Sequence, residues 1–438
     1  MRFDRDEAKR TIERVLALRQ DGDLEVELLA RTASHTRFAR NEITTSGRVE
    51  DVTLSIAARR EGKIGTVGTN DLSDGGLKEA VGRAVGLRDL MPVDPEWVET
   101  LPPQSYPLFE TRDEQAGRAD AADRAAGVKA ALTLAERRHL TAAGFYENNA
   151  EARAIGNSKG NFGHHVSTDV EFSVTMRTSD GTGSGWASSY SPRFSEVDPK
   201  PVARRAADKG IASAKPREVP PGDYTVILEP AAVAALVQTL QFGALSKRSA
   251  DEGRSVFSKE GGGSRIGEKV AHDTVTLVTD PFEARVPALP WSGAGLPNRR
   301  IAWIEKGVLK TLYADRYWAA KTGVAPTPSP GSLVLAGGGA TLDDLIASTD
   351  RGLLVTRFWY IRTVNPQTWH LTGLTRDGLF LIEKGKIAAP AVNLRFNESP
   401  VVMLRNIEAM TSPVPAGRML VPAIKAREFT FTSKSDAV

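Results

Sequence analysis

Histidines are the residues from which metal chemistry would be expected, and their spacing argues against a helical zinc site. A helical zinc motif needs two histidines one turn apart, with a glutamate between them as base. No pair in this chain has that spacing, and His164 and His165 are adjacent in an expected strand, where their side chains point to opposite faces. The histidines of the chain are His35, His139, His164, His165, His272 and His370.

A strip of polar residues beside this histidine pair is a second place for chemistry. His165, Ser167, Asp169 and Glu171 alternate along the expected strand, so their side chains share one face. One interpretation is a solvated polar face, and the other is a polar wall that lines a cavity between domains. Imidazole and carboxylate ligands can bind zinc, but a spacing of two residues is unusual for a metal site. The strip supports only a weaker hypothesis, an independent peptidase with improvised ligands.

Nucleophilic catalysis and phosphate binding find no support in the motifs. Cysteine is absent, which excludes thiolate nucleophiles, disulfides and cysteine-ligated zinc. No Gly-x-Ser-x-Gly elbow with suitable partners occurs in a strand–turn–helix context. The run Gly337-Gly338-Gly339 lacks the Gly-Lys-Ser/Thr ending of a phosphate loop. We therefore predict no catalytic residue, no metal ligand and no cofactor in this chain.

The segment from Gly352 to Asn397 concentrates aromatic and cationic residues between apolar strands. Arginines in such a segment can bind carboxylates or peptide carbonyls in a groove. The alternative is that the aromatic side chains belong to the core and the arginines pair with nearby acids. On the first interpretation, the predicted peptide-binding residues are Trp359, His370, Thr375, Arg376, Asp377 and Arg395.

Two similar stretches in the first half of the chain must position these groups. A helix is expected over residues 6–19, strands from residue 24, over 52–58 and after Gly62, and a helix over 77–85. The order returns later, with Arg153 and Asn157 as counterparts of Arg37 and Asn41, a strand around 170–174, a glycine-rich turn at 181–185 and a helix at 201–212. This order predicts a duplicated strand–strand–strand–helix unit, forming one N-terminal α+β domain over residues 1–215.

A proline-rich boundary, Pro216 to Gly222, separates a second domain over residues 216–438. A strand at 224–228 and a helix at 231–245 are expected to open it. Further strands are expected at 274–278, 300–305, 308–312, 333–336, 353–361 and 379–384, with a short helix at 341–348. The predicted fold class is therefore α+β with two domains, the second being a curved, mainly antiparallel β domain.

Composition and charge restrict the possible partners. Hydrophobic residues make up 41% of the 438 residues and charged residues 25%, as in ordinary folded soluble proteins. The formal net charge is only +3 and no stretch is strongly basic, which argues against direct nucleic-acid contact. The most apolar long stretch, 224–245, contains Glu229, Pro230 and two glutamines, and it falls short of a membrane span. No signal peptide is visible at the charged N-terminus. We predict a soluble, cytoplasmic protein without a membrane partner.

Several motifs, in order along the chain, resemble those of the TldD/PmbA family, zinc-peptidase-related proteins once named for modulation of DNA gyrase. Residues 36–43 resemble the family's early arginine–phenylalanine–asparagine strand motif, and Asn157-Ser158-Lys159-Gly160 is similar to its asparagine–serine–glycine turn. Residues 304–309 resemble its hairpin signature. Residues 352–356, Thr372-Gly373 and 380–387 resemble its C-terminal pattern. One departure is Ser292-Gly293-Ala294-Gly295, which stands where a more acidic turn is expected.

The resemblance implies a specific position for zinc in this family. TldD-type chains carry the metal on a helix with a His-Glu-x-x-x-His type signature, after the first strand of the C-terminal domain. The corresponding stretch here, residues 231–245, contains neither His nor Glu. The chain thus resembles the TldE/PmbA side of the family, which pairs with a TldD-type subunit that holds the zinc. In such pairs the two chains enclose a chamber where unfolded peptides are cleaved.

Two functional hypotheses follow from the resemblance. In the first, the chain is the non-metal subunit of a TldD/TldE-type zinc metallopeptidase, shaping the chamber and binding peptide. In the second, it is a stand-alone homodimeric protein that binds peptides without cleaving them. Whether the chain is itself part of an enzyme therefore depends on its partner, a TldD-type subunit or a second copy of itself.

Overall fold

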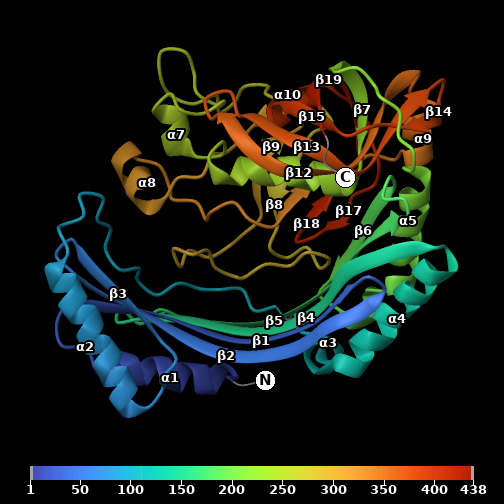
Figure 1. Ribbon diagram of the computed structural model, residues 1–438. Coiled ribbons are helices and arrows are strands. Elements are labelled where there is room, and N and C mark those ends of the chain that lie inside the picture. Colours follow the sequence, from blue (N-terminus) through green and yellow to red (C-terminus); the bar gives the residue numbers. More distant parts are fainter. Residues whose placement is uncertain (1–2, 110, 436–438) are drawn as a thin grey trace.

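The computed structural model describes residues 3–109 and 111–435, and its first half is a long, curved antiparallel sheet (Figure 1). The strand order is β3-β2-β1-β4-β5-β6, so the two central strands, β1 and β4, join two three-stranded halves. The strands are β1 Asp23–Ala39, β2 Glu42–Arg60, β3 Lys63–Thr69, β4 Leu140–Asn157, β5 Phe162–Thr178 and β6 Ser184–Ser191. This symmetric order confirms the predicted duplication.

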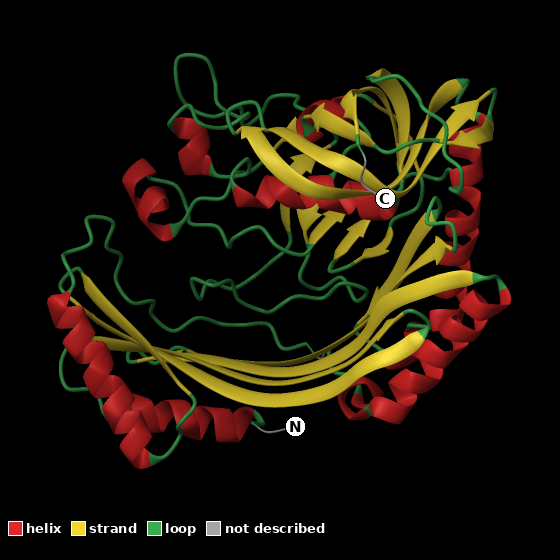
Figure 2. Cartoon of the chain, in the orientation of Figure 1, coloured by secondary structure: helices red, strands yellow, loops and turns green. Residues whose placement is uncertain are grey.

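Helices cover the convex side of this sheet, and the second half of the chain lies over its concave side (Figure 2). The helices are α1 Arg5–Ala17, α2 Asp74–Leu90, α3 Glu114–Arg118, α4 Ala121–Arg137 and α5 Pro199–Ala212. The alternation of β1 explains this arrangement, because Leu24, Val26 and Leu28 are buried against helices while Glu25 and Glu27 point to the concave side. The duplicated unit is larger than predicted, since α4 precedes β4 as α1 precedes β1.

Asparagines occupy equivalent turns of the two units, and the first of them, Asn41, ties its unit to β4. Asn41, in the turn after β1, donates to the carbonyl of Leu140 at 2.9 Å and accepts from the amide of Ala142 at 2.6 Å. Asn157 ends β4, and its Oδ1 accepts from the amides of Lys159 and Asn161 at 3.0 and 3.1 Å. These side chains replace backbone partners in the turns, which explains the asparagine at both positions.

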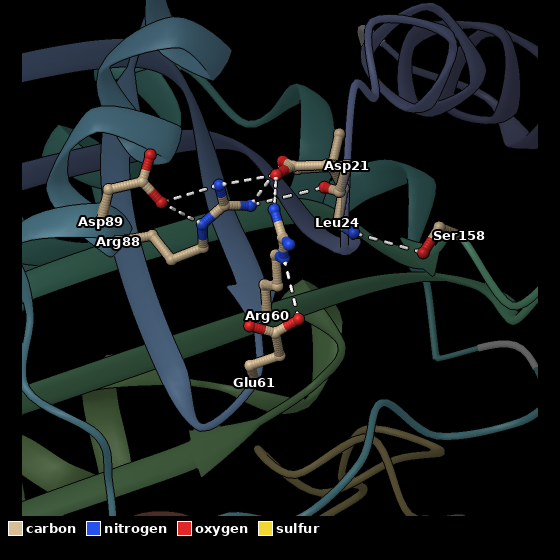
Figure 3. Close-up of polar contacts among 7 residues, drawn as sticks. All are labelled: Asp21, Leu24, Arg60, Glu61, Arg88, Asp89 and Ser158. Atoms are coloured by element: carbon tan, nitrogen blue, oxygen red, sulfur yellow. Dashed lines mark hydrogen bonds and ion pairs between the residues drawn. The ribbon is translucent and has the colours of Figure 1, made fainter.

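A buried arginine anchors α2 to the loop between α1 and β1 (Figure 3). Arg88, only 2% exposed, donates to the Asp21 carboxylate at 2.8 Å and also to Asp89. Arg60, from β2, reaches the same Asp21. The Arg88 hydrogen bond is the main reason that the pKa of Asp21 lies below its ordinary value. A charged group buried in this way is stable because it is fully paired.

The second half of the chain contains two sheets around one large apolar core. The first has the order β10-β9-β8-β11-β18-β17. Its strands are β8 Leu277–Thr279, β9 Ile301–Glu305, β10 Val308–Leu309, β11 Leu333–Leu335, β17 Val414–Ala416 and β18 Met419–Val421. The pairing of β11 with β18 is parallel.

The second sheet closes on itself, because β12 pairs with both β7 and β13. Its order is β12-β7-β19-β15-β13-β14, with β16 beside β19, and only the β7–β12 pairing is parallel. The strands are β7 Gly222–Leu228, β12 Arg351–Asn365, β13 His370–Glu383, β14 Lys386–Pro390, β15 Leu394–Glu398, β16 Ile407–Met410 and β19 Ile424–Lys434. The predicted curved, mainly antiparallel β half is confirmed.

Short helices complete this half, and several expected elements are shorter than predicted. The helices are α6 Pro230–Val237, α7 Lys247–Asp251, α8 Arg316–Thr322, α9 Leu342–Ala347 and α10 Pro400–Arg405. The helix expected over 231–245 ends at Val237 and continues as a 3-10 turn, η2 Gln238–Phe242, because Trp369 packs against Gly243 and bonds to Thr239. The strands expected at 274–278 and 308–312 are reduced to short pieces. No helix in the described ranges is long and apolar enough to span a bilayer.

Candidate functional site

The helix at the position where the resemblance implies zinc is α6, and it offers no metal ligand. It follows β7 directly, and its residues are proline, alanine, valine and leucine. Ala232, Val233 and Leu236 are buried in the core. Glu229, just before the helix, forms an ion pair with Lys209 of α5. The side chains of α6 therefore pack the core and cannot coordinate a metal.

Metal donors do not converge elsewhere in the structure either. Across residues 3–109 and 111–435, no group of three or more His, Cys, Asp or Glu residues is placed to hold a metal ion. The zinc that the family resemblance implies therefore does not fit the donors present in this part of the chain, because zinc requires three or four converging N, O or S ligands.

Acidic side chains meet on the concave face of the first sheet. Glu147 of β4 and Glu171 of β5 are cross-strand partners, and Asp169 lies one position along the same face. Asp169 accepts from Asn149 at 2.9 Å and pairs with Arg418, whose nitrogen lies 2.5 Å from its Oδ1. Because Arg418 belongs to the turn between β17 and β18, this ion pair connects the concave face with the second half of the chain.

The two glutamates of this cluster hold protons more tightly than usual. Burial, and then the charges of Glu147 and Asp169, raise the pKa of Glu171 to about 7. Burial and the Asp169 charge also raise the pKa of Glu147, against the opposing effect of nearby arginines. Two carboxylates directly opposite each other repel, so one proton between them lowers the free energy of the folded chain. The cluster can therefore exchange protons near neutral pH.

His165 lies on the same face, as predicted, but it is held by a structural contact. Its Nε2 lies 3.0 Å from the Thr111 hydroxyl, and its ring packs on Phe109. Burial, with a smaller contribution from His164, lowers its pKa to about 4. The imidazole is therefore neutral at physiological pH. His164 points to the opposite face and contacts the carbonyl of Phe3 at 3.2 Å.

The predicted peptide-binding residues are distributed unequally around the β12–β13 hairpin. Trp359 is 48% exposed, and the Arg376 guanidinium lies 4.7 Å from the centre of its indole ring. Arg395 of β15 pairs with Leu374, so it lies on the same outward face as Arg376. His370, at the far end of β13, is partly exposed. The structure thus brings Trp359, Arg376 and Arg395 onto one surface, with His370 at its end.

Thr375 and Asp377 point elsewhere. Thr375 is fully buried, and its hydroxyl donates to Asn393 at 2.8 Å and accepts from the amide of Leu394 at 2.9 Å. Asp377 is 1% exposed and has a positive φ of 55°. Its carboxylate pairs with Arg357 and accepts from Ser184. Because both oxygens have partners inside the fold, Asp377 connects β13 with β6, and its predicted contact with peptide stays a prediction.

A cavity of about 490 Å³ separates the concave face from the second half of the chain. Its walls come from the sheet, from the connector after α2 and from the second half, and include Glu25, Glu27, Arg59, Asp94, Gly293 and Arg316. The turn around Gly295, which departs from the family pattern, is fixed by the Tyr106 hydroxyl at 2.6 Å. The cavity is in the range that accommodates small ligands or a few residues of a peptide.

Some members of these sites could not be recognised in the sequence. Glu147 and Arg418 join Asp169 and Glu171 only through strand register and through contact between the two halves. Trp186 of β6 lies 4.7 Å from the Arg357 guanidinium, a contact between strands far apart in the chain. The alternation of polar and apolar residues along β4 is the one sequence pattern that could have indicated that Glu147 lies on the concave face.

Comparison with known proteins agrees along almost the whole chain. Residues 24–87, 109–214 and 221–433 match domain 1, the central domain and the C-terminal domain of the PmbA/TldA metallopeptidase models. The fold is similar to that of TldE from Thermococcus kodakarensis, with a TM-score of 0.85, 20% identity, and coverage of 97% of this chain and 100% of that one. It is also similar to a candidate modulator of DNA gyrase from Bacteroides thetaiotaomicron, with a TM-score of 0.84, 21% identity, and coverage of 98% and 99%.

Curated relatives match a smaller part of the chain. A metalloprotease of Methanothermobacter thermautotrophicus is 22% identical over 294 residues, which is 62% of each chain. A metalloprotease TldD homologue of Buchnera aphidicola is 22% identical over 280 residues, 58% of this chain and 56% of that one. The chain thus matches about six tenths of the length of these relatives.

Proposed function

This chain belongs to the TldD/PmbA family of metallopeptidases, and we propose that it is the TldE/PmbA-like, non-metal subunit of a TldD/TldE-type peptidase. In this role it shapes the peptide chamber and binds substrate, while a TldD-type partner holds the zinc and carries out hydrolysis. The observation that carries the proposal is α6, where the position of the family's zinc helix is filled by buried alanine, valine and leucine.

The geometry of the concave face supports the substrate-binding part of this proposal. A cavity lies between the two halves, and its walls combine carboxylates with the guanidinium groups of Arg59 and Arg316. Arg59 is held by Glu25 at 3.0 Å and by the Val98 carbonyl. Such a preformed wall can orient an extended peptide of mixed composition without supplying a catalytic group. The absence of cysteine fits a cytoplasmic location for this subunit.

Complex formation with a TldD-type chain tests the proposal. Purified protein, mixed with a TldD-type chain from the same organism, is expected to elute in size-exclusion chromatography as a stoichiometric complex containing both chains. Two separate peaks, with this chain as a dimer that binds peptides alone, would favour the alternative of a stand-alone homodimeric peptide-binding protein.

A further inference from the structure

The outward face of the closed sheet is built from three cross-strand rows. Arg357 pairs with Arg376 in the first, Trp359 with Leu374 and then Arg395 in the second, and Arg362 with Thr372 and Asn397 in the third. The alternate positions, such as Phe358, Leu371 and Phe396, belong to the core. Three strands, β12, β13 and β15, therefore contribute to one surface.

A β-bulge places Arg362 on this face. The register between β12 and β13 shifts between Trp359 and Arg362, and Tyr360 has a positive φ of 56°. Arg362 is three residues after Trp359, so regular alternation would point its side chain to the core. The extra residue of the bulge turns it to the outward side, like Trp359. Arg362 lies 4.1 Å from the centre of the Tyr360 ring, and Tyr360 is 59% exposed. The bulge thus presents a second arginine–aromatic pair beside Trp359 and Arg376. We name Trp359, Arg362, Arg376 and Arg395 the arginine face.

The charges of the arginine face are compensated only weakly within the described part of the chain. Arg357 has Asp377 as a hydrogen-bonded counter-ion. Arg376, in contrast, reaches that carboxylate only at 3.8 Å, and its buried Nε has no hydrogen-bond partner. Arg362 donates only to the carbonyl of Ile361. No ion pair links Arg362 or Arg395 to a carboxylate among residues 3–109 and 111–435. The three cross-strand rows themselves hold no Asp or Glu.

These properties determine the kind of molecule that the face fits. A dimer whose two-fold axis passes through this face would place three arginines against three arginines, at an electrostatic cost. Arginine forks bind carboxylates in bidentate geometry, and their stacking on Trp359 and Tyr360 fixes the forks in advance. An acidic ligand satisfies these conditions, whereas a second copy packed face to face does not.

We propose that the arginine face binds carboxylate groups of peptides, so that this subunit selects acidic peptide segments. This inference rests on the proposed function only for the idea that peptides are the ligands. It adds a substrate preference and a position outside the cavity described above. Side-chain and C-terminal carboxylates share the chemistry that the arginines recognise.

Fluorescence anisotropy with the purified full-length chain tests this proposal. The probes are labelled ten-residue peptides: one rich in glutamate, its glutamine counterpart, and versions of both with the C-terminus free or amidated. The glutamate peptide is expected to bind at least about 10-fold more tightly at low salt and to lose this advantage as salt rises. An effect of amidation alone would assign the site to C-terminal carboxylates. Equal affinity for glutamate and glutamine peptides, with no effect of amidation, would overturn the proposal.

Variants locate the binding on the face. The triple variant R362Q/R376Q/R395Q is expected to lose the glutamate preference, while the matched control R83Q, on exposed α2, keeps it. The triple lysine variant keeps the charges but not the forks, and it is expected to retain a weaker, salt-sensitive preference. It also keeps the test decisive if the glutamine variant does not fold. Unchanged peptide binding by a folded triple glutamine variant would contradict the proposal.

A TldD-type chain separates this proposal from the broader one. The triple glutamine variant is expected to form the two-chain complex as well as the unmutated protein does. Loss of the complex with intact peptide binding would assign the face to subunit contact and overturn the peptide proposal. Failure of the unmutated chain to form any complex would instead count against the proposed subunit role, and leaves the measured peptide preference standing.

Discussion

Asp377 of β13 accepts a hydrogen bond at 2.6 Å from the hydroxyl of Ser184 in β6, so one carboxylate joins the two halves of the chain. Its other oxygen accepts from the Arg357 Nε at 2.7 Å. Asp377 has a positive φ beside a shift in the β12–β13 register, and its carboxylate lies between Arg357 of β12 and Ser184 of β6. Asp377 thus has a structural role, which is to hold the two halves of the chain together.

Removing the Asp377 charge is expected to destabilise the fold. In Asp377→Asn, Arg357 stays largely buried beside Arg376 without a counter-ion, which costs about 3 kcal/mol of unfolding free energy. Urea unfolding followed by tryptophan fluorescence measures the loss. The control Asp350→Asn, exposed at the start of β12, is expected to change stability by less than about 0.5 kcal/mol.

A double variant tests the cause of this loss. If the uncompensated guanidinium is responsible, R357M/D377N is expected to lose clearly less stability than the two single variants together. Asp377→Asn with normal stability but lost peptide affinity would contradict the structural role and support the peptide contact expected from the sequence.

The raised pKa of Glu171 predicts a pH-dependent stability. The folded chain binds the proton up to about pH 7, whereas the unfolded chain releases it near the ordinary value of 4.5. The stabilising contribution of protonated Glu171 is therefore complete below about pH 4.5 and is lost as the pH rises to about 7. The Glu171→Gln variant has no ionisable group at this position, so it does not lose this stability as the pH rises. Its unfolding free energy minus that of the unmutated chain is expected to increase between about pH 4.5 and 7 by up to roughly 3 kcal/mol.

Comparison of the two proteins at each pH is necessary, because His165 has the opposite effect. Its lowered pKa means that the unfolded chain binds the proton first as pH falls, so stability is lost between about pH 6.5 and 4. That contribution is common to both proteins and cancels in the difference. Chemical unfolding of both proteins at pH 4.5, 6 and 8 measures the difference between their unfolding free energies. A difference that does not change with pH would show that Glu171 ionises normally.

Asn157 is expected to be a major contributor to stability. Its amide donates to the Leu101 carbonyl at 2.9 Å, and its oxygen accepts from two backbone amides. In Asn157→Ala, these buried groups lose their partner, at a cost of about 3 kcal/mol. Asn157→Asp keeps the acceptor and is expected to cost less. Thermal unfolding compares both variants, and a loss below about 1 kcal/mol for the alanine variant would mean that the turn is held by other contacts.

The sequence predicts regular elements well where a periodic pattern continues over many residues. The alternation of Leu24, Val26 and Leu28 identified β1, and the repeated order of elements identified the duplication. Helix α4 was missed, since its alanine-rich sequence has few large apolar residues to reveal a face. The helix expected up to residue 245 ends early because of Trp369, which is more than a hundred residues away in the sequence. Local patterns contain no information about such tertiary contacts.

The candidate sites could be predicted only in part for the same reason. Side chains on one strand, such as His165, Asp169 and Glu171, were correctly placed on one face by their spacing. Strand register was needed to add Glu147, and contact between the halves to add Arg418. Thr375 points inward by alternation with Arg376. The partners of Asp377, Arg357 and Ser184 of β6, come from other strands and could not be read from its own segment.

The most direct test of the account is the zinc content and peptidase activity of the purified chain, alone and mixed with a TldD-type chain from the same organism. Because α6 and the other described residues provide no converging ligand set, we expect no stoichiometric zinc and no cleavage of unfolded peptides by the chain alone. In the mixture, zinc is expected to remain with the TldD-type chain, and cleavage is expected to appear. Stoichiometric zinc with peptidase activity in the isolated chain would contradict the proposed role as the non-metal subunit.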